Sequence, residues 1–319
     1  MNLNPSMPLH WTALPVPPSL LGESPLWHPL EQVLYWSDIP GRRLHRWDPH
    51  TATHREWPLP GETGCIAALD GGGLLLALRE GLARFDADSG QCLPLGAPVN
   101  PPPYDPARER FNDGKVDAQG RWWIGTIYEP RDRPVATLYC LTDGALKAVA
   151  SDCTVSNGLA FSPDARSLYW ADTTSHRVFR WALDAQGWPR GERELLRGWP
   201  LRESGQPLSR YGGRPDGAAM DAEGCYWSAM FEGRRLVRLS PAGDVLASLE
   251  LPVQCATMPC FGGEDLRTLY VTTARHNRPA EELADQPLAG GVLQARVEVP
   301  GLPVPMVARR HLPGLADGL

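Results

Sequence analysis

The chain has 319 residues, a formal net charge of −6, and apolar and charged fractions of 42% and 21%, which are typical of a globular protein. An acidic chain without a basic cluster does not favour nucleic acid as a partner, because phosphate binding depends on lysine and arginine. No apolar run approaches the ~20 residues that a membrane-spanning helix needs.

The N-terminal residues 1–18 are polar and rich in proline, and they lack the basic and apolar regions of a signal peptide. The seven cysteines are odd in number and form no C-x-x-C pair. Most of them lie in apolar or strand-like surroundings, which is typical of buried free thiols in a reducing compartment. We therefore expect a cytoplasmic protein that has no membrane partner.

The chain contains 33 prolines, 32 glycines and 12 tryptophans. Proline and glycine interrupt helices and mark turns, whereas aromatic and β-branched residues favour strands. No long amphipathic helix is evident, and only residues 275–284 suggest a short helical turn. The composition therefore predicts an all-β fold.

One pattern recurs along the chain: a turn, a short aromatic and aliphatic strand, a second turn, and a strand that often contains Arg-Leu or Arg-Val. The copies are spaced by about 40–57 residues, which is the period of propeller blades. They occupy six segments, at residues 33–48, 73–86, 121–141, 167–181, 225–239 and 268–295.

A single blade cannot bury both of its faces, so blades must stack around an axis. Six copies predict a six-bladed β-propeller that forms a single domain over residues 19–311. Residues 1–18 and 312–319 are expected to be tails or closure strands. A β-sandwich is the alternative, but it would not explain six copies of one pattern.

Propellers carry function near the central channel, where segments from every blade converge. The segments that lead into blades one, three, four and five each carry a Glu, Asn or Asp among small or apolar residues, and they span 21–27, 110–117, 155–161 and 213–220. The alternative interpretation is an ordinary turn, since Asn-Asp-Gly, Asn-Gly and Asp-Gly are turn sequences. Recurrence at equivalent places favours a site, and carboxylate and amide oxygens suit a divalent cation.

Several motifs resemble the SMP-30/gluconolactonase/luciferin-regenerating family, which includes regucalcin and bacterial sugar lactonases. They are Glu-Ser-Pro-Leu-Trp (23–27), Arg-Phe-Asn-Asp-Gly-Lys-Val-Asp (110–117) with Gly-Thr (125–126), Ser-Asn-Gly-Leu-Ala-Phe-Ser-Pro-Asp (156–164) with Leu-Tyr-Trp-Ala-Asp (168–172), and Pro-Asp-Gly (215–217). The similarity covers residues 21–273, and it implies a six-bladed propeller with a metal site in its central channel.

The resemblance also implies roles for particular residues. One divalent ion (Ca, Zn, Mn, Mg or Fe) would be held by Glu23, Asn157 and Asp216. The substrate would be contacted by Arg110 and Asn112. Glu129 is the nearest candidate for an acidic residue that contacts the sugar, and Pro130 follows it where some family members have a second acid.

The function implied by the resemblance is metal-dependent hydrolysis of a sugar-derived lactone, such as xylono-, arabinono- or gluconolactone, to the sugar acid. Asp216 is the expected general base. No Gly-x-Ser-x-Gly motif suggests a serine nucleophile. The expected partner is a small-molecule lactone, and the chain is expected to be a monomer or a weak homo-oligomer.

Three alternatives remain open: hydrolysis of aldarate lactones, in which Arg110 would meet a carboxylate; hydrolysis of phosphotriesters; and a non-enzymatic, calcium-binding regulatory propeller. Arg110 and Asn112 disfavour the last, because a purely ion-binding protein needs no polar pocket. Arg214 is expected either to face the cavity or to cap a turn, and the insertion at 199–213 to cover the pocket. His176 and His276 are expected on surface loops.

Overall fold

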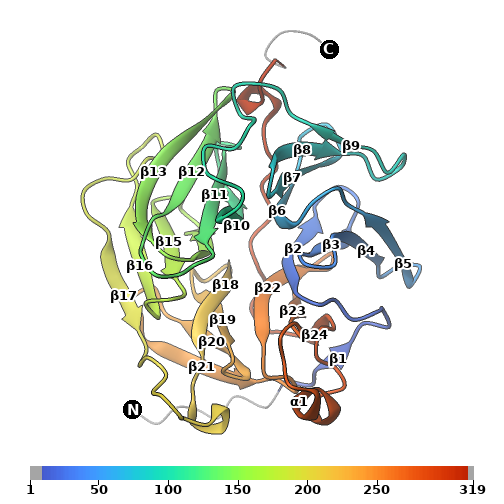
Figure 1. Cartoon of the computed structure of the whole chain (residues 1–319), viewed down its shortest axis with the longest axis vertical. Coiled ribbons are helices and arrows are strands. Elements are labelled where there is room, and N and C mark those ends of the chain that lie inside the picture. Colours follow the sequence, from blue (N-terminus) through green and yellow to red (C-terminus); the bar gives the residue numbers. More distant parts are fainter. Residues whose placement is uncertain (1–8, 315–319) are drawn as a thin grey trace.

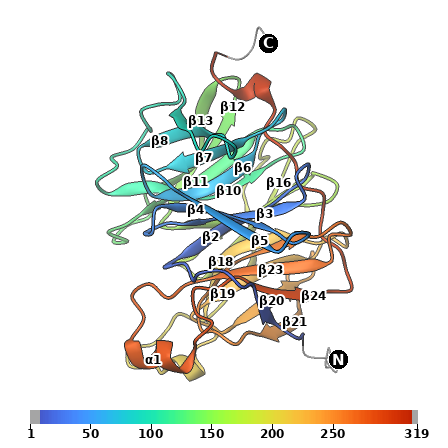
Figure 2. The same cartoon turned by 90° about the vertical axis from the view of Figure 1, so that its right-hand side faces the viewer.

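The structure of the protein, a computed structural model, describes residues 9–314. Six antiparallel sheets of four strands each surround a central channel (Figure 1). The prediction of an all-β, six-bladed propeller is confirmed. Figure 2 shows the same chain from the side, with the α-helix α1 (Ala280–Asp285) at one end of the molecule. None of the helices in this part of the chain is long and apolar enough to cross a membrane.

Blades one to three follow one another along the chain, each running from an innermost to an outermost strand. Blade one contains β2 (Gly22–His28), β3 (Val33–Asp38), β4 (Arg43–Asp48) and β5 (Thr53–Pro58). Blade two contains β6 (Thr63–Ala68), β7 (Leu74–Leu78), β8 (Gly81–Phe85) and β9 (Cys92–Pro94). Blade three contains β10 (Glu109–Val116), β11 (Trp122–Tyr128), β12 (Ala136–Thr142) and β13 (Ala145–Cys153).

Blades four to six complete the circle. Blade four contains β14 (Ser156–Phe161), β15 (Ser167–Asp172), β16 (Arg177–Ala182) and β17 (Glu194–Gly198). Blade five contains β18 (Arg214–Met220), β19 (Tyr226–Phe231), β20 (Arg235–Leu239) and β21 (Val245–Glu250). Blade six contains β22 (Ala256–Gly262), β23 (Thr268–Thr273), β24 (Leu293–Arg296) and β1 (Thr12–Ala13). Short 3-10 turns lie at Leu208–Arg210 and Arg309–His311.

Both ends of the described chain help to close the propeller. Strand β1 supplies the outermost strand of blade six, and the Leu14 amide donates to the Val292 carbonyl at 2.8 Å. The C-terminal segment crosses the middle of the molecule (Figure 1). It forms isolated bridges at Gly301 with Asp221 in blade five and at Val307 with Leu69 in blade two. Ring closure therefore uses segments that lie far apart in the sequence.

Six hydrophobic clusters fill the seams, one between each pair of neighbouring blades. The largest fully buried side chains include the tryptophans of the recurring pattern, such as Trp36, Trp122, Trp123 and Trp170. All seven cysteines are unpaired, and only Cys92 is not fully buried. This arrangement explains the repeat, because each aromatic strand packs against the next blade.

The turn interpretation of the four polar segments is wrong, because each of them is the innermost strand of its blade. Asn112, Asp113 and Gly114, for example, lie inside β10. The repeat pattern had marked only the second and third strands of each blade. Innermost strands tolerate turn-like sequences here because their pairing is interrupted at the same level in all six blades. Such β-bulges leave residues unpaired and change the direction in which their side chains point.

Candidate functional site

The ring of bulges brings polar residues from different blades together at one end of the channel. Asn157, on β14, donates from Nδ2 to Oδ1 of Asp216, on β18, at 2.5 Å. The same Nδ2 group lies 2.9 Å from Thr173 Oγ1. Asn112, on β10, donates from Nδ2 to Asn157 Oδ1 at 3.2 Å and to the Ser156 carbonyl at 3.0 Å. Blades three, four and five are thus joined by side-chain hydrogen bonds at this level.

Glu23, on β2, lies close enough to these residues for its carboxylate to interact electrostatically with Asp216 and Asp113. Burial raises its pKa well above the ordinary value, and the nearby carboxylates of Asp216 and Asp113 raise it further. Burial raises the pKa of Asp216 to about 7, and the Asp113 charge adds to this effect. Three acids crowded in a buried site repel one another, so the group favours a proton or a cation among them.

The donor set of Glu23, Asn157 and Asp216 fits a hard divalent cation. Two carboxylates and one amide supply oxygen ligands of the kind that Ca²⁺, Mg²⁺ and Mn²⁺ prefer. A cation here would also relieve the carboxylate repulsion that raises the pKa of Glu23 and Asp216. Asn157 is 4% exposed and Asp216 is 7% exposed, so competition from bulk water is limited.

Arg110 lies in the channel wall next to this group. Its Nη1 donates to Asn112 Oδ1 and to the Phe111 carbonyl, both at 2.9 Å. Burial lowers its pKa, and the carboxylates of Glu129 and Glu62 oppose this effect. Arg110 therefore holds Asn112, which in turn contacts the Asn157 side chain.

Glu129 lies at the rim and is held by arginines. It accepts two hydrogen bonds from Arg79, at 3.0 and 2.8 Å, and its Oε1 lies 3.6 Å from Arg110 Nε. The hydrogen bonds from Arg79 lower its pKa. Glu129 is therefore an ionised rim residue near Arg110, and its contact with a sugar stays a prediction.

Asp113 has a structural role that the sequence did not reveal. Its Oδ2 accepts from the Leu159 amide at 2.8 Å and its Oδ1 accepts from the Gly114 amide at 2.7 Å. These bonds tie β10 to β14 beside the channel. The only signal in the sequence was a second acid in Asn-Asp-Gly, which was assigned to a turn.

A second charged network lies beside Asp216. Arg214 donates from Nη1 to Glu232 at 2.6 Å, and Arg278, which precedes α1, donates to the other oxygen of Glu232 at 2.7 Å. Arg131 is close enough to Arg214 for the two charges to interact, and burial lowers the pKa of Arg131. No carboxylate among residues 9–314 forms an ion pair with Arg131. Arg214 thus joins an ion-pair network rather than capping a turn.

The surface-loop expectation for His176 is wrong, because this residue is 5% exposed. Its Nδ1 lies 2.8 Å from the Pro200 carbonyl, and its Nε2 lies 3.1 Å from the Tyr211 hydroxyl. Pro200 and Tyr211 both belong to the insertion at 199–213. His176 thus fastens the insertion to blade four, and the role of the insertion as a cover stays a prediction.

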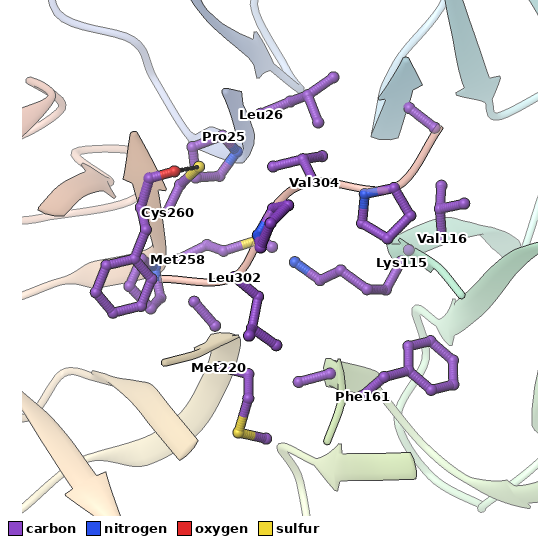
Figure 3. A pocket seen from close by; sticks show the side chains of 18 of the residues that line it. Pro25, Leu26, Lys115, Val116, Phe161, Met220, Met258, Cys260, Leu302 and Val304 are labelled. Atoms are coloured by element: carbon purple, nitrogen blue, oxygen red, sulfur yellow. Dashed lines mark hydrogen bonds between the residues drawn. The ribbon is translucent and has the colours of Figure 1, made fainter. Parts of the chain in front are cut away.

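The opposite end of the channel is apolar. A cavity of about 280 Å³ is lined by the second halves of the innermost strands, including Pro25, Val116, Phe161, Met220 and Met258 (Figure 3). The C-terminal segment runs across it at residues 302–305. The Lys115 amine extends into this space and approaches the Ala218 carbonyl at 3.5 Å. The polar group and this cavity therefore lie at opposite ends of the same strands.

Comparison with known proteins identifies relatives over almost the whole chain. A family described as "SMP-30/Gluconolactonase/LRE-like region" matches residues 21–275. A 6-deoxy-6-sulfogluconolactonase of Pseudomonas putida is 49% identical over 292 residues, covering 91% of this chain and 96% of that protein. A pentonolactonase of Haloferax volcanii is 36% identical over 260 residues, covering 80% of this chain and 81% of its own.

The fold is also found among solved structures. Regucalcin from Agrobacterium tumefaciens, described as a calcium-binding protein, superposes with a TM-score of 0.84 at 27% sequence identity. The match covers 94% of this chain and 98% of that one. The resemblance drawn from the four motifs is thus confirmed over the full propeller.

Proposed function

Because the chain belongs to the SMP-30/gluconolactonase/LRE-like family, we propose that it hydrolyses a sugar-derived lactone with the help of a divalent metal ion. The observation that carries the proposal is the hydrogen-bonded series Arg110, Asn112, Asn157 and Asp216. This series places the hydrogen-bond donors of Arg110 and Asn112 next to the carboxylate of Asp216 and the amide of Asn157. The named lactonases among the relatives support the same reaction.

Glu23, Asn157 and Asp216 would hold the ion. When bound, such an ion supplies Lewis-acid polarisation of a carbonyl oxygen and stabilises the negative charge that develops on it. The sequence around the site offers no alternative ligand set of cysteines and histidines. Calcium, zinc, manganese, magnesium and iron all remain candidates.

The residues of the chain would do the remaining work. Asp216, buried with its pKa raised, is the proposed acceptor of the proton from the attacking water. Arg110 offers a planar set of donors for ring hydroxyls or a carbonyl oxygen, and Asn112 adds a second contact. Holding the lactone in one orientation increases the rate because the reacting groups no longer have to find each other by diffusion.

A second candidate is a lactone that carries an anionic group. Arg131 and Arg214 are close enough for their charges to repel. The carboxylates of Asp216 and Glu129 oppose this effect on Arg131, but among the described residues neither forms a direct ion pair with it. An anion between two guanidinium groups would relieve their repulsion. The relative with 49% identity is named for a sulfonated gluconolactone, which supports this candidate. An aldarate lactone presents a carboxylate and fits the same chemistry.

The test is acid release above the spontaneous rate from a panel of lactones, with and without a chelator. The panel contains neutral aldonolactones, an aldarate lactone, a sulfonated gluconolactone and one phosphotriester. We expect turnover of lactones that is lost on chelation. Turnover of the phosphotriester alone, or calcium binding without any turnover, would instead favour the corresponding alternative.

The variant Arg131→Gln separates the two classes of lactone, because it removes the positive charge and keeps a polar side chain. If the substrate is anionic, kcat/KM should fall for sulfonated and aldarate lactones and stay unchanged for neutral ones. Arg84→Gln, on the exposed face of β8, is the matched control. An equal loss on both classes would contradict the anionic candidate. A cytoplasmic location and a monomeric or weakly associating state remain parts of the proposal.

A further inference from the structure

A group of metal-binding side chains lies outside the channel, on the outer strands of blade one. His45 on β4 is directly opposite Glu56 on β5, and His54 is opposite Trp47. Residues two apart on a strand point to the same face, so His54 and Glu56 flank His45 on one side of the blade. Figure 1 shows β4 and β5 at the periphery, well away from the innermost strands.

The three side chains converge on a small space. Nδ1 of His45 lies 3.0 Å from Nε2 of His54 and 3.6 Å from Oε2 of Glu56. All three potential ligand atoms lie within 4.8 Å of one another. Donor atoms bound to a tetrahedral ion at about 2.0–2.1 Å are themselves about 3.3 Å apart. The two separations measured from His45 Nδ1 are close to that value.

The surrounding residues hold the group in place. Trp36 stacks on both imidazole rings, with centroid distances of 4.9 Å to His45 and 5.8 Å to His54. Arg43 binds the other oxygen of Glu56 at 2.7 Å and leaves Oε2 directed toward His45. Burial lowers the pKa of both imidazoles.

We propose that His45, His54 and Glu56 form a second metal site, selective for a transition ion of the Zn²⁺ class and independent of the oxygen-lined group in the channel. Two imidazoles and a carboxylate suit zinc, cobalt, nickel or copper better than calcium or magnesium. Three protein ligands leave a fourth position for water. The ion would link β5 to β4 and stabilise the outer edge of blade one.

The affinity should be moderate. Nε2 of His45 is buried without a hydrogen-bond partner among residues 9–314. Imidazole ligands generally donate their second N–H group to an acceptor, and loss of that contact weakens binding roughly 10–100-fold. We therefore expect a dissociation constant on the order of micromolar, above the values of fully supported structural zinc sites.

The test is titration of the metal-free full chain with Co²⁺, followed by displacement with Zn²⁺. Four-coordinate cobalt with nitrogen ligands absorbs strongly in the visible region, whereas cobalt bound only by oxygen in six-fold coordination absorbs weakly. We expect the wild type to show the strong band, and the loss of this band in His54→Ala. His50→Ala, an exposed histidine in the turn between β4 and β5, is the matched control and should keep the band.

Zinc should also raise the thermal midpoint of Asp216→Asn, which has lost a proposed channel ligand, but not that of the double variant Asp216→Asn/His54→Ala. His54 is only partly buried, so the variant should stay folded, and circular dichroism checks this. Glu56→Gln should weaken cobalt binding while keeping the contact with Arg43. Equal cobalt spectra in wild type and His54→Ala, or loss of the band in Asp216→Asn alone, would overturn the proposal.

Discussion

At the scale of single residues, the polar end of the channel holds three buried carboxylates close to one another. Glu23, Asp113 and Asp216 are carboxylates within electrostatic reach of one another, and burial raises the pKa of each. Asp113 accepts hydrogen bonds from two backbone amides, Glu23 accepts one from the Ser24 amide, and Asp216 accepts one from the Asn157 side chain. Glu23 and Asp216, which accept fewer hydrogen bonds, are therefore the groups that most need a proton or a cation.

The first prediction concerns Asp216→Asn in metal-free protein. The Asp216 pKa is about 7 in the folded protein against an ordinary value of 3.8. Between these two values the folded state keeps a proton that the unfolded state has lost, so stability falls as pH rises. Because asparagine cannot ionise, the thermal midpoint of the variant should fall less than that of the wild type between about pH 5 and about pH 8.

The same variant should no longer be stabilised by added Ca²⁺ or Mn²⁺, since one ligand charge is lost. The wild type should gain more from the ion at the higher pH, where Asp216 is ionised without it. Identical pH profiles of the metal-free wild type and variant would contradict the role assigned to Asp216.

The second prediction concerns Asn112→Ala, which removes the bridge between Arg110 and Asn157. Loss of a hydrogen bond to a charged group costs about 1.5–3 kcal/mol, which corresponds to roughly ten- to a hundredfold in kcat/KM. The ion should still bind, because its proposed ligands remain. Steady-state kinetics tests the expected loss in kcat/KM, and metal titration of the same preparation tests whether the ion still binds. Unchanged kcat/KM would remove Asn112 from the site.

The residue types could be predicted from sequence, but their local structure could not. The recurrence of Glu, Asn or Asp at equivalent places in four blades indicates a site, and the resemblance to the family implies Glu23, Asn112, Asn157 and Asp216 as its members. The burial of His176 was not visible, since its partner Tyr211 lies in an irregular insertion. Nor did the sequence indicate that Arg79 holds Glu129, because the two come from different blades.

At the scale of elements, the site depends on the β-bulges of the innermost strands. Asn-Gly and Asp-Gly read as turns because glycine permits unusual backbone angles. In β14 Gly158 uses this property inside a bulge, with a φ of +59°. Gly217, in the bulge of β18, has no positive φ, and the space for a Cβ there is filled by Met258. Sequence statistics cannot distinguish these two uses, since both place a glycine after a small polar residue. The distinction comes from the neighbouring strand, which only the folded blade supplies.

The third prediction concerns Gly158→Ala, next to Asn157. Gly158 has a φ of +59°, and an added Cβ would lie 2.2 Å from the Tyr226 hydroxyl oxygen, which donates to the Gly158 carbonyl. Gly191→Ala is the control, since it has a φ of +69° and no atom within 4 Å of an added Cβ. Gly191→Ala should lower the free energy of unfolding by about 1 kcal/mol, and Gly158→Ala should lower it by about 1–3 kcal/mol more. Gly158→Ala should also reduce lactonase activity. Equal losses of stability for the two variants in denaturant unfolding would show that the contact with Tyr226 is unimportant.

At the scale of the whole molecule, the propeller is closed by both ends of the described chain. The repeat count predicted six blades, and their number is confirmed. The sequence could not specify that residues 12 and 13 complete blade six, because a two-residue strand has no recognisable pattern. It also could not place residues 302–305 across the apolar end of the channel, since that contact depends on the finished ring.

The fourth prediction concerns this closure. Leu14 follows β1 directly and is 4% exposed in the cluster between blades six and one. Leu14→Ala should destabilise the protein by about 2–5 kcal/mol, as large-to-small changes in cores do. Leu20→Ala, with 42% exposure, is the control and should have little effect. Equal stability of the two variants in urea unfolding would argue against a closing role for this segment.

The central claim is that the oxygen-lined group at the polar end of the channel binds one ion and that hydrolysis depends on it. Its most direct test is to titrate Ca²⁺ or Mn²⁺ into chelator-treated protein while following acid release from a lactone that the wild type hydrolyses. Turnover should be absent without the ion, rise with bound ion and saturate at a single equivalent, and Asp216→Asn should not recover it. Full turnover after chelation, or wild-type turnover by Asp216→Asn, would contradict the claim.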